Sequence, residues 1–311
     1  MLRLTRYRFT LRMEDPVRLP AYAGSAWRGV FGHGLKQSVC VTRLRDCTNC
    51  TLRSQCIYSY LFETPLYVGK GSNAPQPLVP DLHGLGSRYA PGESFSFEVT
   101  MIGDAARHLP SVIQAWRHSG RQGLGPHRAK FSLSRVELLD LQAEGWQQLI
   151  PRAISNASYE PWREPIALDK TALRQVRIDL TTPYRSKRDG HLVTPERFSA
   201  QGFAVALVNR VASLRKFHDP EAEAFDSGPL MHAAASLTIH EPRLRWREWQ
   251  RHSSRQRTHM QMGGVTGSFT LAGEGLTGLW PVLQLGQWVH AGKGTLFGLG
   301  RYRMRPSEEH T

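Results

Sequence analysis

Residues 279–304 read LWPVLQLGQWVHAGKGTLFGLGRYRM. The stretch begins with an apolar run, Leu279 to Val289, continues through four glycines, and ends in the alternating segment Arg301 to Met304. Run length and periodicity distinguish helices from strands, so this order predicts a helix, a glycine-rich loop and a strand. The first half of the chain ends on the same order, with Gly123-Leu124-Gly125 between a helical pattern and a strand pattern at 131–139.

The segments upstream of each glycine-rich loop also correspond. In the first half, Tyr7 to Met13 alternates as a strand, and a helix follows in which Ser25 can serve as the N-cap. This first helix carries its apolar residues in one stripe, at Trp27, Phe31, Leu35 and Val39. A proline- and glycine-rich passage up to Gly86 then reads as a surface loop before the next strand, at 94–99.

In the second half, strand patterns at 176–180, 237–249 and 265–271 accompany a helical run at 198–214. A recurrence on this scale indicates duplication of one supersecondary unit. The sequence therefore predicts an α+β fold of two tandem ferredoxin-like (βαββαβ) domains, residues 1–162 and 163–311, with a cysteine-rich insertion after the first helix.

The charge balance indicates a polyanionic partner. The 311 residues include 40 lysines and arginines against 26 acids, for a formal charge of +14 and a pI near 10.1. A pI above about 9 is typical of proteins that bind nucleic acid. The chain lacks an apolar run long enough to cross a membrane, and its first twelve residues contain four arginines, so we expect a cytoplasmic protein.

The four cysteines fall within residues 40–56, with a central Cys-x-x-Cys, which favours a metal site over a disulfide framework. We predict a structural zinc held by Cys40, Cys47, Cys50 and Cys56. An iron–sulfur cluster uses the same ligands, and unmetallated cysteines are the third possibility. Four protein ligands would leave zinc no open position, so its expected role is to fold the loop.

The second glycine-rich loop is a candidate phosphate site. Glycines allow a close approach of the backbone, and successive N–H groups can converge on phosphate oxygens. The loop precedes a strand, which excludes a Walker loop, and a tight connection that merely needs small residues is the alternative. The candidate RNA-binding residues of the second half are Arg185, Lys187, Arg188, Arg245, Arg255, Arg257, Gly292, Lys293, Gly294, Gly298, Gly300 and Arg301.

Six segments, in order along nearly the whole chain, resemble the RAMP superfamily of CRISPR-associated endoribonucleases that process repeat RNA. They are residues 19–29, 61–63, 246–249, 254–256, 263–267 and 294–300. The resemblance implies a tandem ferredoxin-like fold and cleavage without a metal cofactor. It further implies attack by a 2′-hydroxyl, leaving a 2′,3′-cyclic phosphate and a 5′-hydroxyl, and retention of the crRNA beside other CRISPR effector subunits.

The first helix is the candidate catalytic element. At about 100° per residue, His33 lies opposite the apolar stripe, with Lys36 one turn away. Gly29, Gly32 and Gly34 are expected to leave this surface bare, which gives a backbone or an RNA room to approach. We predict His33 as general acid or base, Lys36 as phosphate stabiliser and Tyr22 as a positioning or proton-donating hydroxyl; the resemblance supports a histidine here. Arg28 is a further RNA contact, and the reserve candidates for catalysis are Arg28, His127, His290 and Arg255.

Two other functions remain open. A noncatalytic crRNA-binding RAMP subunit would keep the fold and the glycine-rich loop without cleaving RNA. An unrelated zinc-ribbon protein is disfavoured, because the cysteines occupy a short insertion in a much larger repeated scaffold.

Overall fold

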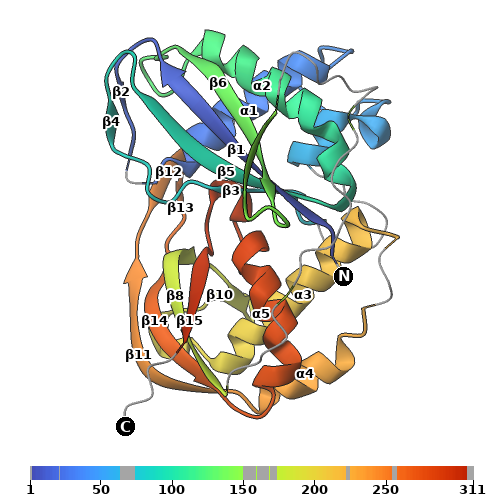
Figure 1. Ribbon diagram of the computed structural model, residues 1–311, viewed down its shortest axis with the longest axis vertical. Coiled ribbons are helices and arrows are strands. Elements are labelled where there is room, and N and C mark those ends of the chain that lie inside the picture. The colour runs from blue at the N-terminus through green and yellow to red at the C-terminus, as the bar shows by residue number, and fades with distance from the viewer. Residues whose placement is uncertain are drawn as a thin grey trace. The chain divides into compact units, whose positions relative to one another are not determined.

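The computed structural model describes residues 2–20, 22–63, 74–149, 159, 168, 174–221, 225–253 and 258–306. The chain separates into two compact units (Figure 1). Unit 1 comprises Met1–Ile166 and Leu214–Ala222, and unit 2 comprises Ala167–Ser213 and Glu223–Thr311. The boundary predicted between residues 162 and 163 lies outside the described residues.

Unit 1 is built on an antiparallel sheet with strand order β3-β5-β1-β6-β7. Its elements are β1 (Leu4–Met13), β2 (Val17–Arg18), α1 (Gly24–Val39), η1 (Arg53–Gln55), η2 (Ser59–Glu63), β3 (Leu78–Asp81), β4 (Arg88–Tyr89), β5 (Ser94–Ile102), η3 (Gly103–His108), α2 (Leu109–Gln122), β6 (Phe131–Asp140) and β7 (Gly145–Leu149).

An aromatic core joins α1 and α2 to this sheet. The Trp27 ring of α1 stacks on Phe97 of β5 at 5.0 Å, and Trp116 of α2 lies 6.4 Å from Phe9 of β1. Large aromatic side chains bury the most apolar area per residue, so this cluster stabilises the contact between the helices and the sheet. Both helices therefore cover one face of the sheet, as Figure 1 shows.

Unit 2 has a four-stranded antiparallel sheet with strand order β11-β14-β8-β15. Its elements are β8 (Gln175–Tyr184), β9 (Lys187–Arg188), β10 (His191–Leu192), η4 (Pro195–Arg197), α3 (Ala200–His218, whose last residues belong to unit 1), α4 (Gly228–Ala235), β11 (Thr238–Arg247), β12 (Gln250–Ser253), β13 (Thr258–Gln261), β14 (Gly264–Ala272), α5 (Leu276–Val289), η5 (Thr295–Phe297) and β15 (Tyr302–Pro306).

The core of unit 2 again lies between two helices and one sheet face. Phe203 of α3 packs edge-on against Phe269 of β14 at 5.6 Å and against Tyr302 of β15 at 5.5 Å. The Tyr302 hydroxyl donates to the carbonyl of Leu283 in α5 at 2.5 Å. Because the ring and its hydroxyl are both satisfied, Tyr302 can stay fully buried and tie β15 to both helices.

The two main sheets share one topology. The order is β3-β5-β1-β6 in unit 1, where β7 adds a fifth strand at the edge, and β11-β14-β8-β15 in unit 2. With these four strands of each sheet numbered in chain order, both sheets have the order 2-3-1-4, and a helix follows the first and third strands. This is the arrangement of a βαββαβ unit. The predicted mixture of helices and antiparallel sheets is therefore confirmed.

Several local predictions were wrong. Leu78 and Val79 are buried in β3, inside the passage predicted to be a surface loop up to Gly86. The first helix begins at Gly24, one residue before the predicted cap, and Ala23 at the N-cap position makes no side-chain hydrogen bond.

Among the described residues, no helix has both the length and the apolar character needed to cross a membrane.

Candidate functional site

His33 projects from the solvent-facing side of α1. Trp27, Phe31 and Leu35 are buried on the opposite side, so their four-residue spacing orients the helix. The His33 side chain is exposed, and Tyr22, directly before the helix, is half-buried. An exposed imidazole can exchange protons with a bound substrate, which is the property that the candidate role requires.

Two glycines of α1 give neighbouring protein groups room to approach, and a third stays open. A Cβ at Gly32 would lie 2.3 Å from the Phe62 ring, and one at Gly34 would lie 2.2 Å from both the Ala115 carbonyl oxygen and Ser119 Oγ. These two glycines therefore admit neighbouring protein groups. Only Gly29, of the three, has nothing within 4 Å of a built Cβ and remains open to a ligand.

Lys36 supports the segment of cysteines instead of standing free beside His33. Its Nζ donates to the Arg45 carbonyl at 3.0 Å and lies 5.5 Å from the Tyr58 ring centroid. Burial raises the pKa of the Cys47 thiol, and Lys36, which hydrogen-bonds to that thiol, acts in the opposite direction. Of the ammonium's three donors, at least one is thus committed to the loop.

Arg28 lies five residues before His33 on α1 and is also engaged. Its guanidinium carbon lies 4.2 Å from the centroid of the Phe62 ring, a cation–π geometry. The same ring fills the space above Gly32. Phe62 thereby fixes the position of a cation on α1.

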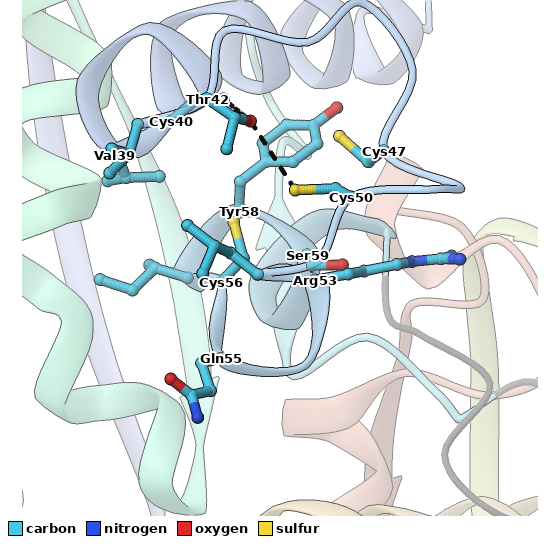
Figure 2. Close-up of a pocket in the computed structure, with 13 residues that line it drawn as sticks. Val39, Cys40, Thr42, Cys47, Cys50, Arg53, Gln55, Cys56, Tyr58 and Ser59 are labelled. Carbon is cyan, nitrogen blue, oxygen red and sulfur yellow. Dashed lines mark hydrogen bonds between the residues drawn. The ribbon is translucent and has the colours of Figure 1, made fainter.

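The four cysteines line one cavity of about 230 Å³ after α1 (Figure 2). The Thr42 hydroxyl lies between two of them, 3.8 Å from Cys40 Sγ and 3.7 Å from Cys50 Sγ. Among the described residues, which include all of 40–56, no three His, Cys, Asp or Glu side chains form a group that could hold a metal ion.

The predicted zinc site at Cys40, Cys47, Cys50 and Cys56 is therefore not supported, and neither is the iron–sulfur alternative. All four thiols are free, and the donor set does not fit a tetrahedral site in this arrangement. The same segment exposes three large apolar side chains, Val41, Leu44 and Leu52.

The second glycine-rich loop runs from α5 to β15. Gly292, Gly294, Gly298 and Gly300 have φ of 77°, 80°, 75° and 74°, a conformation that other residues adopt at a cost. At Gly300 a Cβ would lie 1.8 Å from the Ala291 carbonyl oxygen, so the two ends of the loop touch. The Ala291 N–H donates to the Gly300 carbonyl at 2.8 Å and closes the loop.

Several amides of this loop donate within the protein. The N–H groups of Phe297 and Leu299 donate to the Gly294 carbonyl, that of Gly298 donates to the Thr295 carbonyl, and that of Gly300 donates to the Pro183 carbonyl. Backbone donors bonded in this way are not directed at a ligand. The predicted phosphate cradle stays a prediction for the other amides of the loop, and the compactness of the loop explains its need for glycine.

The fold brings Arg185 to the glycine-rich loop. The Lys293 N–H donates to the Arg185 carbonyl at 2.7 Å, and Arg185 Nη1 donates to the Gly263 carbonyl at 2.8 Å. Arg301 lies at the other end of the loop, where its Nη1 donates to Thr181 Oγ1 at 3.1 Å. Arg185, remote in sequence, thus contacts the loop whose two ends carry Lys293 and Arg301.

The remaining predicted RNA contacts fall into two groups. Lys187 and Arg188 are exposed on β9. Arg245 is exposed on β11 with Arg243 and Arg247, and the intervening Leu244 and Trp246 are half-buried, so the alternation predicted for this strand is present. Arg255 and Arg257 lie outside the described residues.

The reserve histidines differ in their surroundings. His127 is exposed in the connection between α2 and β6. His290 is buried at the end of α5, with Nδ1 3.2 Å from the Leu299 carbonyl oxygen, so it supports the glycine-rich loop.

One residue beside the glycine-rich loop was not predicted from the sequence. Arg210 of α3 donates to three oxygens of α5 and the loop. A lone arginine amid the largely apolar run from Phe203 to Leu214 was the signal that could have identified it.

Two family models together cover most of the chain. The AF_1859_N N-terminal domain matches residues 2–161, a range that contains every described strand of unit 1, from β1 to β7. The model of the CRISPR-associated endoribonuclease Cas6 matches residues 178–302, from β8 to the first residue of β15. This part of the chain is therefore a Cas6 domain, which supports the predicted resemblance to CRISPR-associated endoribonucleases.

Solved Cas6 structures have the same fold. Thermus thermophilus Cas6 aligns with a TM-score of 0.55 at 13% identity, over 98% of this chain and 99% of that one. A Cas6 product complex aligns with a TM-score of 0.57 at 15% identity, over 97% and 99%. A partial Cas6-RT-Cas1–Cas2 complex aligns with a TM-score of 0.58 at 14% identity, over all of this chain and 47% of that one.

A relative in sequence comes from Archaeoglobus fulgidus. This uncharacterized protein is 27% identical over 123 residues. The match takes in 40% of this chain and 42% of the relative, so less than half of either protein is compared.

Proposed function

We propose that this chain is a Cas6-type endoribonuclease that cleaves CRISPR repeat RNA. The observation that carries the proposal is the Cas6 domain over residues 178–302, because it includes the glycine-rich loop and the arginines around it. The charge of +14 supports the same substrate, since neutralising phosphates is the main source of affinity for RNA.

The proposed reaction is a transesterification within the RNA. The 2′-oxygen forms a bond to the adjacent phosphorus as the bond from phosphorus to the 5′-oxygen breaks. A base accepts the proton of the 2′-hydroxyl and an acid protonates the leaving 5′-oxygen, so the products are a 2′,3′-cyclic phosphate and a 5′-hydroxyl. Because both proton transfers can use side chains, the reaction needs no metal.

We assign His33 to one of these proton transfers, because its imidazole is exposed on α1 and an imidazole can both accept and donate a proton. Lys36 would stabilise the developing charge with a donor that the Arg45 carbonyl does not use, and Tyr22 would position the ribose. Arg28 would bind a neighbouring phosphate.

Unit 2 would hold the RNA strand. The proposed contacts are Arg185, Lys187, Arg188, Arg245, Arg255, Arg257, Arg301 and Lys293 with the surface of the loop around Gly292, Gly294, Gly298 and Gly300. Partners would include the crRNA after cleavage and other CRISPR proteins. Supporting this, solved Cas6 structures include a product complex and a Cas6-RT-Cas1–Cas2 complex.

The test is incubation of the protein with repeat RNA in excess EDTA, followed by analysis of the ends. Cleavage with a 2′,3′-cyclic phosphate is the expected result. A repeat carrying a single 2′-deoxyribose at the mapped site is the matched control and should remain intact. Cleavage of that deoxy substrate, or cleavage that requires added metal, would contradict the proposed chemistry.

Repeat RNA that is bound but never cut would favour the second candidate, a noncatalytic crRNA-binding subunit. The observation in favour of that candidate is the engagement of Lys36 and Arg28 by neighbouring protein groups, which leaves His33 with less support than predicted.

A further inference from the structure

Arg210 spans two parts of unit 2 that meet at the glycine-rich loop. Its Nε donates to the carbonyl oxygens of Val289 and His290, both at 2.9 Å, and these residues end α5. Its Nη2 donates to Thr295 Oγ1 at 2.9 Å, in the middle of the loop. The guanidinium therefore lies within hydrogen-bond distance of both the start and the centre of the loop.

The charge of Arg210 has no counter-ion in the described part of the chain. None of the described acids acts on its charge, and its three acceptors are neutral oxygens. Loss of solvent lowers the pKa of Arg210 to about 9. Carbonyls at the end of a helix carry partial negative charge, but this offsets only part of a full cation.

The side chain nonetheless retains donors for a ligand. Arg210 as a residue is half-buried, and its Nη1 is not among the buried polar atoms that lack a partner, so this edge of the guanidinium keeps some contact with solvent. A guanidinium has five N–H groups, and Nη1 donates to no group in the described part of the chain. Lys293, an exposed residue of the same loop, carries a second positive charge.

We propose that Arg210 is an RNA-phosphate-binding residue of the glycine-rich loop. This inference rests on the proposed function and deepens it, because it identifies a cation that the loop itself does not contain. A phosphate of the RNA backbone would accept from the free edge of the guanidinium and supply the missing negative charge. The recognised chemistry is the phosphodiester and not a base, so Arg210 contributes affinity without sequence preference.

A purely structural Arg210, which only caps α5, predicts a different result. Loss of a cap lowers stability and can lower affinity, but it does not change how many counterions RNA releases on binding. Each phosphate contact contributes about 0.7 to the slope of log affinity against log salt for a single strand. The salt slope therefore separates the two roles.

The experiment measures binding of a repeat RNA made uncleavable by one 2′-deoxyribose, at several salt concentrations. Arg210→Gln should weaken binding about five- to tenfold at 0.1 M salt and reduce the slope by about 0.7, whereas Arg210→Lys should retain most of the slope. Lys216→Gln removes one exposed charge from the same helix and should change neither. Thermal unfolding of each variant accompanies the titrations.

A second measurement uses the folded wild type and Arg210→Lys, and so does not depend on the stability of Arg210→Gln. Single methylphosphonates are placed along the RNA to remove one phosphate charge at a time. A methylphosphonate at one linkage should weaken binding to the wild type. The same substitution should weaken binding to Arg210→Lys less, because lysine keeps the charge but lacks the paired N–H donors of the guanidinium. An unchanged salt slope in Arg210→Gln, or the same linkage profile in both proteins, overturns the inference. Failure of the wild type to bind repeat RNA would instead reject the proposed function.

Discussion

The two glycine-rich connections occupy the same place in the repeated fold and are built differently. In unit 1, Leu124 and Ala129 exchange backbone hydrogen bonds of 2.8 and 3.0 Å, so the connection between α2 and β6 closes on itself. In unit 2 the loop between α5 and β15 contains a 3₁₀ turn and is tied to Arg185 and Arg210, which come from other elements.

The comparison shows how a duplicated fold can acquire a site in only one copy. The turn from Leu124 to Ala129 closes through its own backbone, and among the described residues the connection is bound from outside only at Lys130, by Glu14 and Asp15. The loop of unit 2 is held by a second strand end and a second helix, so its surface is fixed by the body of the unit. Rigid support of this kind is what positions ligand-binding groups accurately.

The largest expected effect comes from filling the space that the unit 2 loop needs. Gly300→Val should lower the free energy of unfolding by about 3–5 kcal/mol, because its Cβ would clash with the Ala291 carbonyl oxygen and a β-branched residue would have to adopt a positive φ. Gly125→Ala is the matched change in unit 1. Gly125 also has positive φ, but a Cβ there meets nothing within 4 Å, so we expect a loss of about 1 kcal/mol.

Chemical denaturation of both variants measures the difference. RNA binding should fall with Gly300→Val even under conditions where the protein is folded, and should be retained by Gly125→Ala. Equal losses of stability and binding in the two variants would remove the distinction between the loops.

The next effect tests whether unit 1 contributes chemistry while unit 2 contributes binding. His33→Ala should slow single-turnover cleavage by about 100-fold or more, which is the usual contribution of a general acid or base, with little change in RNA affinity. His232→Ala alters an exposed histidine of α4 and is the matched control. A loss below about tenfold would remove His33 from proton transfer and direct attention to His127.

The fold was predictable because each element carries a periodic pattern. Phe9 and Leu11 alternate with polar residues in β1, and Trp27, Phe31 and Leu35 recur along α1, so burial follows directly from spacing. β3 was missed because only Leu78 and Val79 are buried in it and a proline follows them. A strand of four residues offers too short a pattern to outweigh proline and glycine on either side.

The site was predictable only where residue type and helix geometry were sufficient. The exposure of His33 followed from its angle to the apolar stripe. The partners of Gly32 and Lys36 did not, because Phe62 and Arg45 reach α1 through tertiary packing that no local pattern encodes. The same reason applies to the glycine-rich loop, whose amides are satisfied by carbonyls as remote as Pro183.

The smallest expected effect concerns the cysteine segment, residues 40–56. A metal bound there would hold a loop of unit 1 in place and so reduce the difference between the two units. Because Thr42 separates Cys40 from Cys50 and no three ligands form a metal group in the described residues, we expect less than about 0.2 zinc or iron per chain after anaerobic purification. EDTA should then leave the unfolding temperature unchanged. Stoichiometric zinc, lost on chelation together with stability, would mean that metal binding rearranges residues 40–56 and that both units carry a loop fixed from outside their own backbone.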